Sequence, residues 1–197
     1  MRFLKENSYN VIKFYINQLG ISIFSLLLYS SVATMKNEEI SLRLTIAISV
    51  FAILFYFVLI YTASWDMGAS DIIRIEAGRM QKQKFKGALI AFFANIANLI
   101  LAGMCVISML LYMNGNEGAI ALSQIANAIL RLTYAMNIGL LQGIFQTFSS
   151  DANMYNLLQS CGYLVLPLIS IMITHFGYIF GMKNFRIFPT SKKTKKK

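Results

Sequence analysis

The chain has 197 residues, of which 57% are hydrophobic and only 13% are charged. An ordinary soluble domain carries about 25% charged residues, because a small globule must cover much of its surface with polar groups. The composition therefore excludes a typical soluble domain and indicates a protein embedded in lipid. The net charge of +10 lies in clusters between long apolar runs. We interpret it as a determinant of membrane topology and expect no nucleic-acid partner.

Apolar runs without charge predict the membrane spans, since a spanning helix needs about 20 mostly apolar residues. The predicted spans cover residues 14–35, 44–65, 87–113 and 157–182. The first run is longer than the apolar core of a secretory signal peptide, so we expect it to remain as a signal anchor. The predicted fold class is all-α: a polytopic bundle of about four spanning helices in one transmembrane domain, residues 1–182.

The positions of lysine and arginine predict the orientation, because short loops rich in these residues stay in the cytoplasm. Residues 1–13 contain three, the loop 66–86 contains five and the tail 183–197 contains seven. We therefore expect both termini in the cytoplasm and residues 183–197 to form a basic cytoplasmic tail. Frequent Lys, Asn, Ile and Tyr favour an AT-rich bacterium, and we expect the bacterial cytoplasmic membrane.

Residues 119–150 are apolar enough for a fifth span but contain Arg131 and many amides. If the third span runs outward and the last runs inward, this segment begins and ends outside, so a single crossing is excluded. A helical wheel places its polar side chains on one side, namely Gln124, Asn127, Arg131, Gln142 and Gln146. We favour an interfacial or re-entrant amphipathic segment over a spanning hairpin, with Gly139 and Gly143 as candidate breaks.

Four polar residues are candidates for a polar cavity: Asn95, Asn98, Arg131 and His175. Asn95 and Asn98 share one helical face with small residues. Helix packing is the simpler explanation, since amides hydrogen-bond between membrane helices, and a substrate path near the bilayer centre is the functional alternative. His175 is the only histidine, and a lone histidine is usually a hydrogen-bonded packing residue rather than a proton relay.

Glycines at a spacing of four indicate places where two helices cross closely. The pairs are Gly139 with Gly143 and Gly177 with Gly181. Such GxxxG pairs let backbones approach and can also support oligomers.

The loop 66–86 is a candidate site for docking a cytoplasmic partner. We expect Ser70 to cap a short amphipathic helix at the membrane surface. The candidate docking residues are Ile72, Ile73, Arg74, Arg79 and Met80. The alternative is that this helix rests on anionic lipids, which attract its basic side chains.

Catalytic signatures are not found in the sequence: there is no HExxH, no GxSxG and no acidic metal cluster. We therefore expect no enzyme activity, no metal and no cofactor. The preferred function is a permease-like subunit of a membrane transport complex, which works with a protein partner or as a homo-oligomer. The alternative is a non-transporting membrane protein that senses, anchors or assists assembly of a membrane complex.

Overall fold

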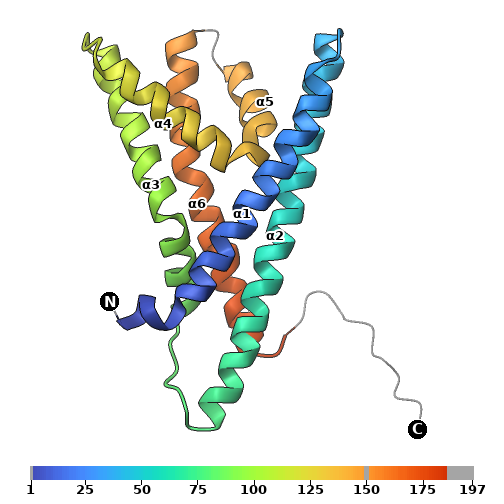
Figure 1. The fold of residues 1–197 in the computed structure, drawn as a ribbon, viewed down its shortest axis with the longest axis vertical. Coiled ribbons are helices and arrows are strands. Elements are labelled where there is room, and N and C mark those ends of the chain that lie inside the picture. The colour runs from blue at the N-terminus through green and yellow to red at the C-terminus, as the bar shows by residue number, and fades with distance from the viewer. Residues whose placement is uncertain (1, 149–150, 186–197) are drawn as a thin grey trace.

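The computed structural model describes residues 2–148 and 151–185, and every regular element in this part of the chain is a helix (Figure 1). Four helices are long and apolar enough to cross a membrane. They are α1 (Arg2–Ala33), α2 (Glu38–Glu76), α3 (Lys86–Met113) and α6 (Ala152–Met182). Between α3 and α6 lie α4 (Ala119–Thr133), the 3₁₀ helix η1 (Ala135–Asn137) and α5 (Ile138–Phe148). The predicted all-α fold with four spanning helices is confirmed.

The segment between α3 and α6 forms a bent pair of helices, with an angle of 88° at the break. Figure 1 shows α4 descending from the tip of α3 and α5 rising back toward the start of α6. Both outer ends of the pair therefore lie at the same end of the bundle. This geometry is re-entrant and agrees with the prediction that the segment does not cross once.

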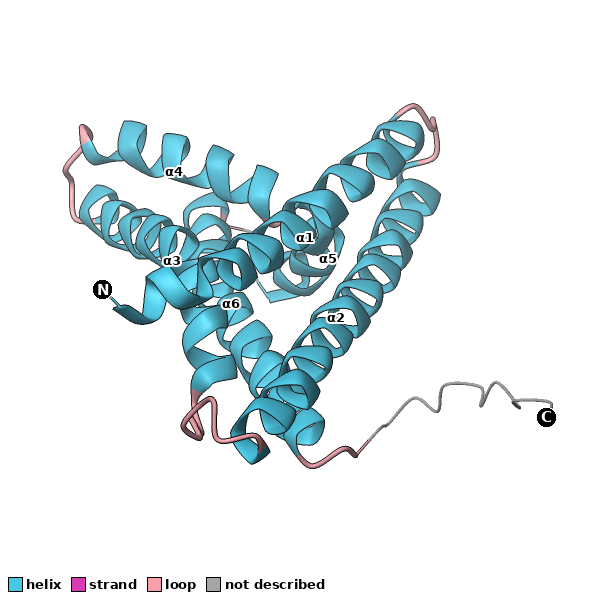
Figure 2. Cartoon of the chain, turned by 60° about the horizontal axis from the view of Figure 1, so that its bottom comes forward, coloured by secondary structure: helices cyan, strands magenta, loops and turns pink. Residues whose placement is uncertain are grey.

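The bundle has two distinct ends, which we name by their connections. At the "loop end" lie the start of α1, the α2–α3 loop (residues 77–85) and the end of α6, and at the "turn end" lie the α1–α2 and α3–α4 turns (Figure 1). Helix α6 packs against both α2 and α3. Both views show α2 and α3 diverging toward the turn end, with α4 and α5 in the space between them (Figure 1, Figure 2).

Helix α2 is 39 residues long, or about 58 Å at about 1.5 Å per residue, nearly twice the hydrocarbon thickness of a bilayer. It begins where Asn37 Oδ1 accepts a hydrogen bond from the Ile40 N–H at 3.1 Å. It ends at Glu76, and Gly78, whose φ is 70°, allows a Schellman cap after the helix. The prediction of a separate helix capped by Ser70 is therefore wrong, because α2 runs through Ser70 without a break, and the end of the membrane span at residue 65 stays a prediction. Charged residues end the apolar run after residue 65, but none of them breaks a helix.

Glycines bring α2 and α6 into backbone contact. A Cβ on Gly68 would collide with the backbone of α6, and a Cβ on Gly177 or Gly181 would collide with atoms of α2. The glycine pair of α6 thus serves a crossing within the chain. Away from these contacts, large apolar side chains such as Phe51 and Met172 are more than half exposed, as expected for lipid contact.

The re-entrant geometry predicts which residues share a side of the membrane. In a background with Cys105→Ser and Cys161→Ser, we expect Asn37→Cys, Asn116→Cys and Asn153→Cys to react with an impermeant thiol reagent from the same side. Gln81→Cys in the α2–α3 loop should react only from the opposite side. Sealed vesicles of known orientation provide the measurement. Labelling of Asn116→Cys and Asn153→Cys from different sides would contradict the re-entrant arrangement.

Candidate functional site

The break between α4 and α5 lies inside the protein. Helix α4 ends at Thr133, and the four residues that follow are at most 3% exposed. They are Tyr134, Ala135, Met136 and Asn137. The end of a helix leaves backbone carbonyl groups without their usual partners, and away from water each such group needs another donor.

Helix α1 supplies the donors for the break. Gln18 Nε2 and Ser22 Oγ both donate to the carbonyl oxygen of Thr133, at 3.3 Å and 2.7 Å. About two turns further along α1, the Tyr29 hydroxyl donates to the carbonyl oxygen of Met136 at 3.4 Å. Gln18 and Ser22 are completely or almost completely buried. One face of α1 is therefore polar because it pairs with the broken helix.

Helix α2 holds the other side of the break. A Cβ on Gly139 would collide with the carbonyl oxygen of Thr45, and a Cβ on Gly143 would lie 2.8 Å from the Ile46 side chain. These two glycines were predicted as breaks, but the break lies before them, at residues 134–137. Their place is inside α5, where they let it pack directly against α2.

The two predicted amides of α3 lie beside the break. Asn95 and Asn98 are 3% and 1% exposed. The Tyr134 hydroxyl donates to Asn95 Oδ1 at 3.1 Å, while Asn95 Nδ2 donates to the carbonyl oxygen of Ala91 within α3. Asn98 Nδ2 has no hydrogen-bond partner among the described residues. Tyr134 also stacks on Tyr163 of α6 at 6.1 Å, so α3, the break and α6 meet here.

Arg131 lies apart from these amides, in a cavity of about 290 Å³ that Ser123, Gln124 and Asn127 of α4 also line. The start of α6 closes this cavity with Asn153 and Asn156, so it lies at the turn end. The Arg131 guanidinium donates to Gln159 Oε1 at 3.2 Å. None of the residues that line the cavity is acidic.

His175 lies toward the loop end, where its ring stacks on Phe85 with centroids 5.6 Å apart. The four candidate cavity residues therefore do not share one cavity. Asn95 and Asn98 flank the break, Arg131 lines a cavity at the turn end and His175 lines another beside the α2–α3 loop.

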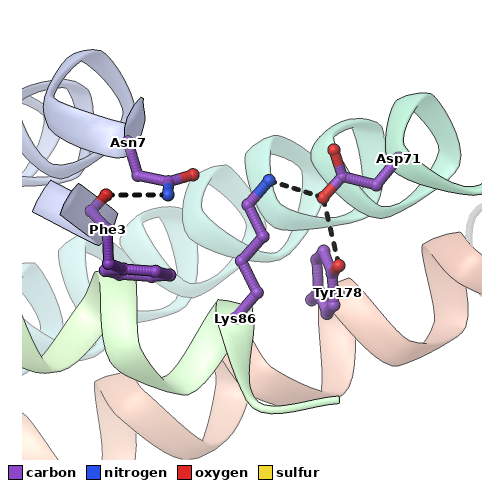
Figure 3. A network of polar contacts seen from close by, with 5 residues as sticks. All are labelled: Phe3, Asn7, Asp71, Lys86 and Tyr178. Carbon is purple, nitrogen blue, oxygen red and sulfur yellow. Dashed lines mark hydrogen bonds and ion pairs between the residues drawn. The ribbon is translucent and has the colours of Figure 1, made fainter. Parts of the chain in front are cut away.

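The structure contains a buried ion pair that sequence reasoning missed (Figure 3). Lys86 Nζ at the start of α3 lies 2.7 Å from Asp71 Oδ2 of α2, and the Tyr178 hydroxyl of α6 donates to the same oxygen at 3.0 Å. The side chains of Lys86 and Asp71 are 8% and 3% exposed. A Cβ on Gly68 or Gly87 would collide with Tyr178, so both glycines make room for it. The three groups join α2, α3 and α6 at the loop end.

The candidate docking residues lie at the loop end of α2 and in the loop that follows. Ile73 is 66% exposed, and Arg74 and Arg79 are also exposed. Ile72 and Met80 are partly buried. An apolar side chain as exposed as Ile73, next to charged residues and beyond the predicted apolar span, is suited to contact with a partner or with the membrane surface.

Comparisons with protein-family models, with curated proteins and with solved structures found no match to this chain. Within residues 2–148 and 151–185, no three His, Cys, Asp or Glu side chains converge in a way that could hold a metal ion.

The donors on α1 predict a specific loss of stability. Ser22→Ala removes the shorter hydrogen bond to the Thr133 carbonyl and should lower the free energy of unfolding by about 1 kcal/mol. Ser25→Ala is the matched control, because Ser25 is equally buried but its hydroxyl bonds to Ile21 within α1. The decrease in the free energy of unfolding caused by Ser25→Ala should be smaller by a factor of about two or more. Denaturation in detergent measures both, and equal losses would show that the break does not depend on Ser22.

The ion pair predicts strong coupling between two positions. Asp71→Asn and Lys86→Gln each leave one buried charge without its partner, so each should lower the free energy of unfolding by about 3 kcal/mol or more. Asp71→Leu combined with Lys86→Met should recover most of that loss, because neither charge then remains buried. A double-mutant cycle on thermal or denaturant unfolding, with Asp71→Leu and Lys86→Met made singly and together, gives the coupling, and additive losses would contradict a paired site.

Proposed function

We propose that this chain is a permease-like, non-enzymatic subunit of a membrane transport complex. The observation that carries the proposal is a helix pair broken inside the bundle and surrounded by buried amides and hydroxyls. Polar groups are costly at membrane depth and therefore tend to mark functional paths. Transporters in particular build substrate sites at discontinuous helices, where backbone groups are free to bind.

The turn end offers openings beside the broken pair. A cavity of about 710 Å³ lies between the α1–α2 hairpin and α5, lined by Tyr29, Gln142 and Gln146 among others. The Arg131 cavity, of about 290 Å³, lies beside α4. The larger cavity falls within the usual size of small-molecule sites. The Arg131 cavity, with its mainly polar lining, supports a route for a polar solute from the turn end toward Tyr134 and the amides of α3.

We infer the orientation of the chain in the membrane from the distribution of its lysines and arginines. The loop end carries Lys82, Lys84 and Lys183 with Arg74 of α2 and Arg79 of the α2–α3 loop, whereas the basic residues described at the turn end and its cavity are Lys36, Arg43 and Arg131. We assign the loop end to the cytoplasm and the chain to a bacterial cytoplasmic membrane, since basic short loops stay inside. In intact cells, the thiol reagent should then reach Asn37→Cys from outside.

The loop end also supports the presence of a partner. Helix α2 is longer than a bilayer is thick, and its last turns carry the exposed Ile73 between Ile72 and Arg74. Buried apolar anchors dominate protein interfaces, so Ile73 is the residue through which this helix would dock. A partner protein or a second copy of the chain would cover it.

A non-transporting role is the second candidate, and close packing of the break favours it. Tyr134 and Ala135 are at most 1% exposed, as in a rigid core. A protein that anchors or assists assembly of a complex would need the same shape without a route through it. The two candidates differ in whether the cavities at the turn end connect to the other side during function.

Co-purification after mild solubilisation tests the subunit proposal. Wild type should bring down a stoichiometric partner, Ile73→Ser should lose it and Ile73→Leu should keep it, because leucine preserves the apolar anchor. Lys82→Gln with Lys84→Gln is the control for charge, and this variant should retain the partner. Lys86 is left unchanged because it is committed to Asp71.

The outcomes separate the alternatives. Loss of the partner only in Ile73→Ser supports docking through α2. Loss only in the lysine variant would mean that charge, and not the apolar anchor, holds the assembly. If wild type purifies alone as a monomer, the subunit proposal fails.

A further inference from the structure

The cavity at the loop end that His175 lines has a composition that the proposed function does not use. It measures about 310 Å³ and lies where the α2–α3 loop passes beside the end of α6. Lys82 and Lys84 of the loop line it, together with Lys183 after α6. Phe85, Ile179 and Met182 form its apolar part.

The three lysines of this cavity are not neutralised by the protein. No acidic residue lines the cavity, and no ion pair joins Lys82, Lys84 or Lys183 to a carboxylate among residues 2–148 and 151–185. The neighbouring Lys86 differs, because Asp71 is its partner. Like charges gathered at a low-dielectric wall create a strongly positive potential, which attracts an anion.

The wall of the cavity belongs to the lipid-facing surface. Phe85 is 65% exposed and stacks on His175. Phe176 and Met172 of α6, which are 49% and 58% exposed, extend this apolar surface from His175 toward the middle of the helix. The lysines therefore lie next to an apolar strip along α6, and an acyl chain can pack against this strip.

His175 adds a polar group between the lysines and the apolar strip. Neither of its ring nitrogens has a hydrogen-bond partner among the described residues, and Nδ1 is buried. In the neutral tautomer with its proton on Nε2, that ring nitrogen can donate a hydrogen bond to a ligand, because Nδ1 rather than Nε2 is the buried nitrogen. A phosphate oxygen is a suitable acceptor.

We propose that this cavity binds the headgroup of an anionic phospholipid, with the phosphate among the lysines and an acyl chain along Phe176 and Met172. Free inorganic phosphate would satisfy the charges but would leave the apolar strip unused. The cavity combines positive charge with an apolar strip. This arrangement complements a lipid at the membrane interface, which combines an anionic headgroup with apolar acyl chains. The site would exist whether or not the chain transports a solute.

Native mass spectrometry of the full chain in neutral detergent tests this site. Wild type should retain one phosphatidylglycerol molecule in preference to phosphatidylcholine of the same acyl composition. Lys82→Gln with Lys84→Gln should weaken this retention about thirtyfold, which corresponds to two contributions of about 1 kcal/mol at 1.4 kcal/mol per factor of ten. Arg74→Gln with Arg79→Gln removes the same charge outside the cavity and should change retention less than threefold.

The controls separate a loss of lipid binding at this cavity from misfolding and from diffuse attraction to anionic lipid. All four substituted residues are exposed, and an unchanged thermal midpoint would show that both variants are folded. Equal weakening in the two double variants would overturn the site in favour of diffuse attraction between a basic surface and anionic lipid. Equal retention of the two lipids by wild type, or displacement of phosphatidylglycerol by millimolar inorganic phosphate, would also overturn it.

Discussion

The fold depends on backbone carbonyl groups that the end of α4 leaves without partners inside the bundle. In water such groups would be solvated, but in a membrane protein each needs a donor from the chain itself. Gln18 and Ser22 of α1 provide two donors to the Thr133 carbonyl, and Tyr29 provides one to that of Met136. The position of α1 across the bundle is therefore tied to the break.

The sequence was sufficient to predict four spanning helices, because a helix that crosses the bilayer needs a long apolar run. The sequence was not sufficient to predict where α2 ends. Asp66 ends the apolar run and Asp71 follows it in the predicted loop, where a charge suggests solvent. In the structure the Asp71 carboxylate is buried because Lys86 and Tyr178 provide partners for it. The small residues Ser64 and Gly68 continue one face of α2 toward Asp71, and this spacing was the signal that the helix does not stop.

The candidate site was predicted only in part for a similar reason. Asn95 and Asn98 stood out because amides are unusual inside an apolar span, and both lie beside the break. Gln18 and Ser22 did not stand out, because they lie near the start of a span and their partner, Thr133, is more than 100 residues away. The local sequence pattern shows which residues are polar. It does not show to which distant backbone carbonyl groups their side chains donate hydrogen bonds.

The two ends of the bundle differ in how firmly they are joined, and this difference bears on mechanism. At the loop end, Gly68 and Gly181 place α2 and α6 in backbone contact, and the Asp71–Lys86 pair adds α3 to the same junction. At the turn end, α2 and α3 diverge, and the broken pair lies in the space between them (Figure 1). Separation of helices at the loop end would require a buried charge to lose its partner, at a cost of about 3 to 5 kcal/mol. Movement of α4 and α5 leaves that pair intact, so a conformational change in this chain is expected at the turn end, with the loop end as its fixed base.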